Sequence, residues 1–264
     1  MTGPGPGGAR LTVDLNSDLG ESFGPWTMGH DAALMPSITS ANVACGFHAG
    51  DPSVMRQTIR LAKQHGVAVG AHPGFADLVG FGRREMSLAP SELEDLVLYQ
   101  LAAMAGVAAT EGVRLQHVKA HGALYNMAAR DASLARAIAR AVVAFDPTLI
   151  LFGLPNSALL QGGEAAGLCV AAEVFADRTY EADGSLTSRR VPGSVIQDPA
   201  QVISRAVDMV VTGQVTATDG TVVPLRADTI CVHGDTPGAA DLARKIRAAL
   251  EAAGIKVAAL GTSL

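Results

Sequence analysis

Short runs of β-branched and apolar residues alternate along this chain with longer segments of helical period, and this alternation limits the fold more than any other feature. It is typical of parallel strands joined by crossover helices. The seven runs expected to be strands are 11–15, 38–44, 67–71, 115–120, 149–152, 168–174 and 228–233. An eighth run, 255–260, is either a further strand or a closing extension.

Residues that start and stop helices lie between these runs. The predicted helices begin at a polar residue next to a proline or at a capping box, and several end at a glycine. These signals are Asp51 with Pro52 before Gly66, Ser91 with Glu94, Asp198 with Pro199 before Gly213, and Thr236 with Pro237 before Gly254.

Two segments interrupt the alternation, 178–192 and 214–225. Each carries an Asp-Gly pair between strand-like residues, which predicts a β-hairpin. Because no linker and no repeat beyond the βα unit occurs, residues 11–264 are interpreted as one domain. Residues 1–10 are rich in Gly and Pro without an apolar run, so we expect a disordered tail rather than a secretion signal.

Composition excludes several classes of protein. With 48% hydrophobic and 17% charged residues, the chain is not intrinsically disordered. A net charge of −5 without a basic cluster argues against a nucleic-acid partner. The longest apolar stretch, 142–154, is interrupted by Asp146 and Pro147 and is shorter than the roughly 20 residues that a bilayer span needs. We therefore expect no membrane segment and a cytoplasmic protein.

Sequence signatures of common cofactors are missing. The cysteines Cys45, Cys169 and Cys231 form no CxxC pair, so neither a disulfide framework nor a thiolate zinc site is indicated. No GxxxxGK[ST] loop occurs, and no GxGxxG lies between a predicted strand and a helix. Any nucleotide would bind by another route or on another polypeptide.

Polar and titratable residues gather at the carboxyl ends of the predicted strands, where parallel barrels place their chemistry. In chain order these residues are Asp14, Asn16, Asp18 and Glu21; Asn42, Cys45, His48 and Asp51; His72; Lys119 and His121; Glu173, Asp177 and Arg178; and His233 and Asp235.

The first acidic group has two interpretations. Asp14 and Asp18 share strand spacing and would act as metal ligands or as an acid and base pair, or they cap a following turn. Together with Glu21 they need a counter-charge nearby. Lys119 is the candidate, because a lysine within an apolar strand has either a chemical task or a structural ion pair.

Histidines and arginines offer two further functions. His48 and His121, with Asp18 or with His72 and a carboxylate, would form a metal site, although a single loop histidine is more often structural. The glycine-rich segment 73–86 carries Arg83 and Arg84, which would hold an anionic substrate or belong to a solvated surface loop.

Several long motifs resemble the LamB/YcsF family. They are VDLNSDLGESFG (13–24), ANVACGFHAGDP (41–52), GAHPGF and DLVGFGRREM (within 70–86), VKAHGALYN (118–126), EVFADRTYEADGSLTSRR (173–190) and VHGDTPGA (232–239). Their order and length make the resemblance specific, and it covers essentially everything after the first ten residues.

The resemblance implies a distorted, seven-stranded (β/α) barrel akin to sugar deacetylases and some glycosidases. It also implies ATP-dependent opening of 5-oxo-L-proline to L-glutamate together with 5-oxoprolinase subunits B and C. From the position of these residues after successive strands, our hypothesis is that Asp14 or Asp18 is the general base, Lys119 stabilises negative charge, and His72 or His121 protonates the departing nitrogen. Arg83 or Arg178 would hold the substrate carboxylate. The candidates for substrate binding are Asn42, Arg83, Arg84, Glu173, Arg178 and His233.

Two other functions remain open from the sequence. The first is a metal-dependent amidohydrolase or deacetylase of N-acyl sugars that acts alone through Asp18, His48 and His121, with a divalent metal as cofactor. The second is a non-catalytic subunit that binds substrate. A requirement for ATP and partners separates the first from the 5-oxoprolinase hypothesis, and turnover at saturating substrate separates the second.

Overall fold

The computed structural model describes residues 11–232 and 238–261. The strands are β1 (Thr12–Leu19), β2 (Ser40–Ala44), β3 (Ala68–His72), β4 (Leu115–Lys119), β5 (Ile150–Gly153), β6 (Val170–Phe175), β7 (Gln214–Thr216), β8 (Val222–Pro224), β9 (Thr229–Cys231) and β10 (Lys256–Val257). The helices are α1 (Asp31–Leu34), α2 (Pro52–His65), α3 (Pro90–Thr110), α4 (Gly122–Ala128), α5 (Ala132–Phe145), α6 (Ala158–Ala165), α7 (Pro199–Thr212) and α8 (Ala239–Ala252). The expected tail 1–10 and the predicted helix start at Thr236 and Pro237 lie outside the described residues.

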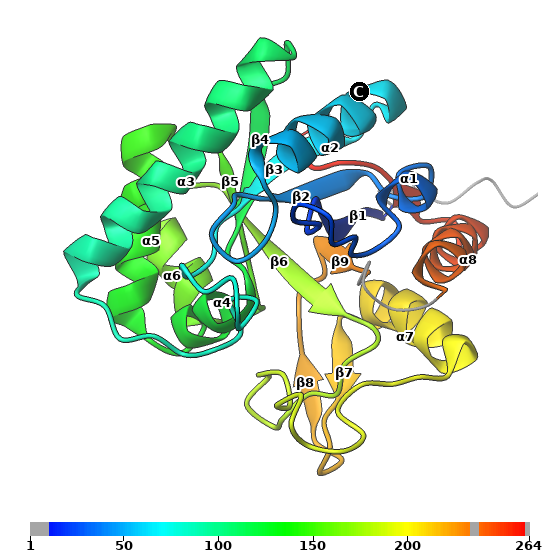
Figure 1. Cartoon of the computed structure of the whole chain (residues 1–264). Coiled ribbons are helices and arrows are strands. Elements are labelled where there is room, and N and C mark those ends of the chain that lie inside the picture. Colours follow the sequence, from blue (N-terminus) through cyan, green and yellow to red (C-terminus); the bar gives the residue numbers. More distant parts are fainter. Residues whose placement is uncertain (1–10, 233–237, 262–264) are drawn as a thin grey trace, which may run out of the picture.

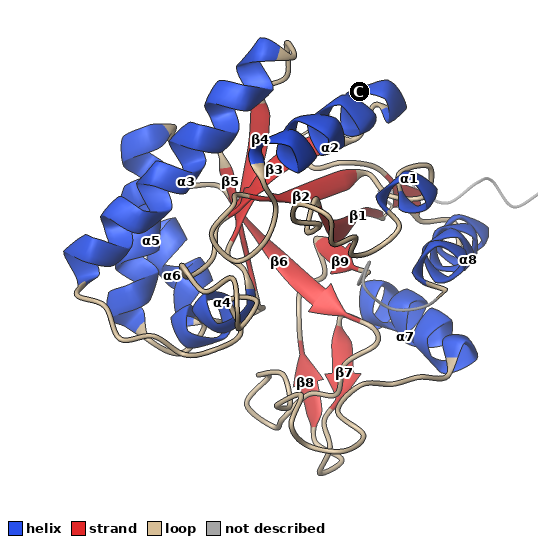
Figure 2. Cartoon of the chain, viewed as in Figure 1, coloured by secondary structure: helices blue, strands red, loops and turns tan. Residues whose placement is uncertain are grey.

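Seven parallel strands close into a barrel. Strands β1 to β6 are neighbours in chain order, β6 pairs with β9, and β9 returns to β1. The longer helices lie outside the strands (Figures 1 and 2). The predicted seven-stranded (β/α) barrel is therefore confirmed. Run 255–260 is an extension rather than a barrel strand, because β10 pairs only with Thr12 and Val13 of β1.

Strand β1 is longer than the sequence predicts. Expected over 11–15, it continues to Leu19 because residues Asn16 to Leu19 pair with β2. The added residues include Asn16, Ser17 and Asp18, which have low intrinsic preference for strands, so pairing with neighbouring strands overrides local propensity here.

The capping signals of two helices are confirmed. Asp51 accepts hydrogen bonds from the N–H groups at the start of α2, and Gly66 ends that helix with a φ of 66°. Asp198 and Gly213 do the same for α7. The capping box predicted at Ser91 and Glu94 was wrong by two positions.

Helix α3 begins at Pro90, with Ala89 at the N-cap, and Glu92 accepts from the Ala89 N–H at 2.8 Å. Among the described helices, α3 alone is long and apolar enough to cross a membrane by length and composition. Its residues Leu93, Val97 and Leu101 are nevertheless fully buried. Burial of one apolar face is the packing of a helix in the outer layer of a barrel.

Of the two predicted hairpins, one is built from regular strands. The other is a short antiparallel turn around Asp183 and Gly184, in which the Glu181 N–H donates to the Ser185 carbonyl oxygen. Strands β7 and β8 pair antiparallel around the turn at Asp219 and Gly220, and this hairpin projects from the barrel (Figure 2). The segment 178–192 instead contributes isolated bridges, including one between Tyr180 and Leu186. Its backbone is held partly by side chains, because the guanidinium of Arg178 donates to the carbonyl oxygens of Thr187 and Ser194.

The barrel interior is polar. On β1, Val13, Leu15 and Leu19 belong to the apolar core, whereas Asn16 and Asp14 hydrogen-bond to side chains of other barrel strands. This alternation follows from the two-residue period of a strand. Polar side chains are therefore buried together between the strands, directly beneath the strand ends.

Candidate active site

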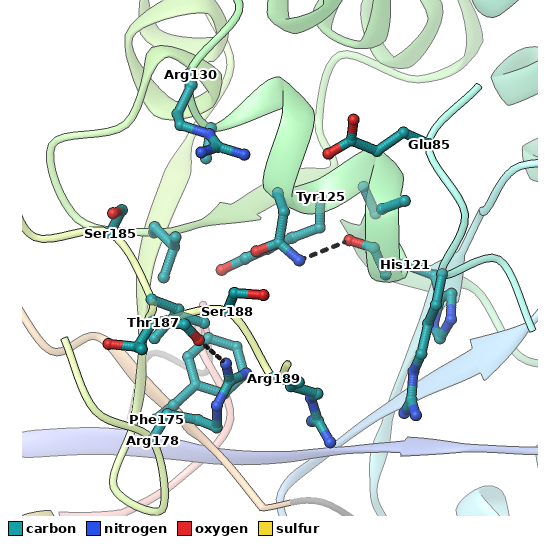
Figure 3. A pocket seen from close by; sticks show the side chains of 18 of the residues that line it. Glu85, His121, Tyr125, Arg130, Phe175, Arg178, Ser185, Thr187, Ser188 and Arg189 are labelled. Carbon is teal, nitrogen blue, oxygen red and sulfur yellow. Dashed lines mark hydrogen bonds between the residues drawn. The ribbon is translucent and has the colours of Figure 1, made fainter. Parts of the chain in front are cut away.

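A cavity of about 810 Å³ opens at the carboxyl ends of the strands. Side chains from β1, β3, β4 and β6 line it, together with loop 83–85, helix α4 and the segment 178–190. Figure 3 shows Tyr125, Arg178, Thr187, Ser188 and Arg189 gathered around it. This volume is typical of pockets that bind small molecules.

Lys119 lies at the floor of the cavity between two carboxylates. Its Nζ is 2.8 Å from Oδ1 of Asp18 and 2.7 Å from Oε1 of Glu173, and it lies 3.2 Å from Sγ of Cys231. Burial alone would lower the pKa of Lys119, but the attraction of Asp18, Cys231 and Glu173 outweighs burial and holds it well above its usual value. The predicted counter-charge is thus in place.

Asp18 connects this lysine to the histidines. Its Oδ1 accepts from Lys119 and, at 2.8 Å, from Nδ2 of Asn42, while its Oδ2 lies 3.4 Å from Nε2 of His72. Burial would raise the pKa of Asp18, yet His72 and Lys119 lower it well below its ordinary value. The carboxylate is therefore ionised at neutral pH and available as a base at the cavity wall.

Asp14 does not reach the cavity. Its carboxylate accepts hydrogen bonds from the hydroxyls of Thr39, Ser40 and Thr229 at 2.6, 2.7 and 2.5 Å, deep in the barrel. Burial raises its pKa despite these donors. Asp14 and Asp18 were predicted together from their spacing, and the structure separates them.

Tyr125 lines the cavity near Lys119, and Glu173 lies behind Lys119 without lining the cavity. Glu173 is fully buried. Burial of Tyr125, together with the nearby carboxylate of Glu173, raises the pKa of Tyr125 well above its usual value. The Tyr125 hydroxyl is therefore a proton donor rather than a phenolate. Sequence patterns gave no signal for Tyr125, because it lies within helix α4.

Three histidines and a glutamate converge beside Asp18. One ligand atom each from Glu21, His48, His72 and His121 lies within 4.8 Å of the others. His72 is the last residue of β3, and Glu21, His48 and His121 follow β1, β2 and β4. The histidines of the predicted metal site are thus brought together, but Glu21 supplies the carboxylate and Asp18 pairs with Lys119.

The hydrogen bonds of the two central rings fix where their protons lie. Nδ1 of His72 is 2.7 Å from the carbonyl oxygen of Lys119, and Nε2 of His121 is 2.8 Å from that of Phe81. Because carbonyl oxygens only accept, both of these nitrogens carry protons. In neutral rings the remaining nitrogens are acceptors, although they lie 3.0 Å apart. A metal ion or an additional proton must reconcile them.

His48 completes the cluster. Its ring stacks on that of His121 at 3.7 Å between centroids, and its Nε2 lies 3.5 Å from Oε1 of Glu21. Neither ring nitrogen of this buried residue has a hydrogen-bond partner among the described residues. Burial lowers the pKa of His48 well below its usual value and that of His121 to about 3, so both rings are neutral, as metal ligands are.

Segment 73–86 forms a fixed cover over these histidines. Gly82 has a φ of 61°, and a Cβ atom there would lie 2.7 Å from Cβ of His48 and 2.8 Å from Cδ2 of His121. Glycine is therefore required for this close approach. Arg83 and Arg84 both line the cavity. Arg84 forms an ion pair with Asp77 inside the same segment, and Arg83 places its guanidinium over the ring of Phe81.

Arg178 is a buried cation that also lines the cavity. Figure 3 shows its guanidinium directed to the carbonyl oxygen of Thr187, and the second contact, to the carbonyl oxygen of Ser194, is 3.3 Å. These partners carry no net charge. Burial and the nearby Arg189 lower the pKa of Arg178 to about 10. The Asp177 carboxylate acts against this shift, and an anion in the cavity would add to its attraction for the guanidinium.

The remaining substrate-binding candidates differ in position. Glu173 lies beside Lys119 and Asn42 lies below Asp18, inside the barrel. His233 lies outside the described residues. Sequence analysis did not select His117, which contacts Asn42 at 2.7 Å. Its position two residues before Lys119 could have indicated that His117 also points into the barrel, because alternate residues of a strand share a face.

The chain is similar to known proteins over nearly its whole length and nearly the whole of theirs. The model of the LamB/YcsF family matches residues 13–264. The A subunit of 5-oxoprolinase from Methylococcus capsulatus is 59% identical over 250 residues, which cover 95% of this chain and 96% of the relative. The protein of the same name from Bordetella pertussis is 58% identical, with 94% and 98% covered. A solved lactam utilization protein from Thermus thermophilus superposes with a TM-score of 0.90 at 52% identity, covering 95% of this chain and 100% of that one.

Proposed function

Because the chain belongs to the LamB/YcsF family, we propose that it is the subunit of an ATP-dependent 5-oxoprolinase that opens the lactam of 5-oxo-L-proline to L-glutamate. The observation that carries the proposal is the cavity floor, where Lys119 joins the ionised Asp18 and Asp18 lies 3.4 Å from His72. The names of the relatives, which describe a 5-oxoprolinase and a lactam utilization protein, support the choice of substrate.

The chemistry of the substrate explains the need for ATP and partners. A five-membered lactam is a resonance-stabilised amide, and water is a weak nucleophile toward it. Phosphorylation of the lactam oxygen would activate the carbonyl carbon. Since the sequence has no phosphate-binding loop, we assign ATP binding and phosphorylation to subunits B and C and ring opening to this chain. Use of cellular ATP supports a cytoplasmic complex.

Three side chains would act on the activated ring. Asp18 accepts a proton from the attacking water through Oδ2, the oxygen that faces His72. Lys119 stabilises the negative charge of the phosphorylated oxygen. Collapse of the water adduct breaks the C–N bond and leaves an acyl phosphate, which a second water hydrolyses to phosphate and L-glutamate. His72 delivers a proton to the departing nitrogen from Nε2. His121 is the weaker candidate, because its Nε2–H donates to the carbonyl oxygen of Phe81.

Arg178 is a better candidate than Arg83 for binding the substrate carboxylate. It is buried at the cavity wall, and its hydrogen bonds to Thr187 and Ser194 go to neutral carbonyl oxygens. A guanidinium binds a carboxylate through two parallel hydrogen bonds. Arg83 stacks on Phe81 and would add positive charge at the rim.

The histidine cluster supports a divalent metal ion as an alternative to the proton on His72. Glu21, His48, His72 and His121 would hold it, a donor set that suits zinc and similar ions. Such an ion would supply a Lewis acid at the cavity wall. A proton and a metal ion exclude each other at Nε2 of His72, and this alternative favours metal-dependent hydrolysis without ATP.

Reconstitution tests these functions. The chain is mixed with subunits B and C, ATP and 5-oxoproline, glutamate is measured, and each component is omitted in turn. We expect glutamate only from the complete mixture and none with Asp18→Asn. Hydrolysis by the metal-loaded chain without ATP would overturn the proposal in favour of the metal-dependent hydrolase. Unchanged turnover of Asp18→Asn at saturating substrate would reduce the chain to a binding subunit.

A further inference from the structure

His117 and Asn42 form a hydrogen-bonded pair beneath the cavity floor. Both side chains are fully buried, and Nε2 of His117 lies 2.7 Å from Oδ1 of Asn42. His117 precedes Lys119 by two residues on β4, so it lies one layer deeper on the same inward face. Neither side chain lines the cavity, and any effect on the reaction must pass through a neighbour.

The surrounding acceptors determine how the Asn42 amide is turned. Its Nδ2 donates to Oδ1 of Asp18 at 2.8 Å and to Oδ1 of Asn16 at 2.7 Å. The amide oxygen therefore faces His117, which must donate from Nε2. The other ring nitrogen, Nδ1, has a longer contact of 3.3 Å with Oε1 of Gln116. Burial lowers the pKa of His117 to about 3, so the ring is neutral and carries one proton.

Packing holds the imidazole in this orientation. The ring stacks on Phe152 at 4.3 Å between centroids and 9° between planes. On β3, a Cβ atom at Gly70 would lie 2.1 Å from Nε2 of His117, so the absence of a side chain there provides the space for the ring. The donor is thus aimed at Asn42 before any substrate binds.

We propose that His117 is a positioning residue for the ring-opening reaction: its Nε2–H holds the Asn42 amide so that the NH2 group, and not the oxygen, faces Asp18. The inference rests on the proposed function for the role of Asp18. Without the donor at Nε2, the amide oxygen is buried without its partner, and only the contacts of Nδ2 with Asp18 and Asn16 oppose rotation of the amide. We expect the amide to turn over more readily. Its oxygen would then repel Oδ1 of Asp18 and displace the carboxylate from Lys119.

A pair of substitutions separates positioning from packing. His117→Gln retains an N–H donor near the position of Nε2 but lacks the ring, whereas His117→Phe retains a stacked ring but has no donor. Positioning predicts that His117→Phe loses kcat roughly tenfold to a hundredfold with little change in KM, while His117→Gln stays closer to the unsubstituted chain. Packing alone predicts the reverse order. Both variants are assayed in the reconstituted complex, and the reverse order would overturn the proposal.

A spectroscopic measurement on the unsubstituted chain decides the matter if a variant fails to fold. Histidine labelled with ¹⁵N reports the tautomer of each ring, and His117→Gln identifies the His117 signals. We expect the neutral Nε2–H form at neutral pH. An Nδ1–H form would overturn the proposal. This measurement needs no substrate, so a complex that does not open 5-oxoproline would refute the proposed function while leaving the tautomer result to stand.

Discussion

Asp14 and Asp18 face the interior of one barrel from the same strand, and only Asp18 reaches the cavity. A rise of about 3.3 Å per residue places them about 13 Å apart along the strand. Asp14 accepts from three hydroxyls, whereas Asp18 accepts from an ammonium group and an amide. Identical side chains on the same face therefore have different environments, which can be tested separately.

The raised pKa of Asp14 predicts how stability varies with pH. Above its ordinary value of 3.8, the unfolded chain has lost this proton while the folded chain retains it. The free energy of unfolding therefore falls as pH rises from that value through the raised pKa of the folded state. Asp14→Asn cannot ionise and should lack this decline. Urea denaturation of both proteins between about pH 4 and pH 7 measures the difference.

Two controls accompany Asp14→Asn. We expect it to retain ring-opening activity, because Asp14 lies outside the cavity. Asp18→Asn should lose activity by about 10²-fold to 10⁴-fold, the usual contribution of a general base. Equal losses from the two substitutions would show that depth in the barrel does not separate their roles.

Lys119→Met tests the ion pair at the cavity floor. The substitution leaves the partly exposed carboxylate of Asp18 and the buried carboxylate of Glu173 without their shared cation. Breaking a buried pair in this way typically costs about 3–5 kcal/mol of unfolding free energy. The raised pKa of Lys119 means that its contribution is complete below the unfolded value of 10.5 and is lost only as pH rises through the folded value. Urea denaturation at neutral pH measures the loss.

A double substitution distinguishes lost charge balance from lost shape. Lys119→Met with Glu173→Gln removes one of the two stranded carboxylates, so it should be more stable than Lys119→Met alone. Activity should remain absent in both, since the ammonium group is missing. A double variant less stable than the single one would contradict the charge explanation.

The strand positions could be predicted from the sequence because each barrel strand presents an apolar face to the helices. Leu15 on β1 and Val43 on β2, for example, are buried in this core. Helix ends were predictable where one local hydrogen bond determines them, as at Asp51. At Ser91 the same reasoning was wrong, because Pro90 can occupy the first position of a helix and so moved its start.

The site could be predicted only in part. The ends of strands indicated Lys119, His72 and Asp18, since a barrel brings strand ends together. Depth could not be predicted, because the register between β1 and β9 decides that Asp14 pairs with Thr229 near the start of β9. Glu21, and not Asp18, is the carboxylate of the four-residue cluster, and its position depends on the geometry of a loop, which strand spacing does not specify.

The histidine cluster predicts binding of a divalent ion. We expect the chain to bind about one Zn²⁺ per molecule, and His48→Ala to weaken binding by at least about tenfold because it removes one ligand of four. Isothermal titration calorimetry with Zn²⁺ alone measures this. His65→Ala, at an exposed position at the end of α2, is the matched control and should bind normally. If the unsubstituted chain binds no Zn²⁺, the prediction of a metal site is wrong, and an additional proton between the rings of His72 and His121 is the remaining explanation of their contact.

Arg178 and Arg84 predict different responses to loss of a guanidinium at the cavity. Arg178→Gln removes a buried cation that donates to carbonyl oxygens, so the substrate carboxylate loses its binding partner. Loss of a charge-assisted hydrogen bond of about 1.5–3 kcal/mol raises KM for 5-oxoproline roughly tenfold to a hundredfold. Arg84→Gln breaks the ion pair between Arg84 and Asp77. Because the Arg84 side chain is largely exposed, this substitution should leave KM nearly unchanged. Steady-state kinetics of the reconstituted complex measures both, and a KM that rises only for Arg84→Gln would transfer carboxylate binding to segment 73–86.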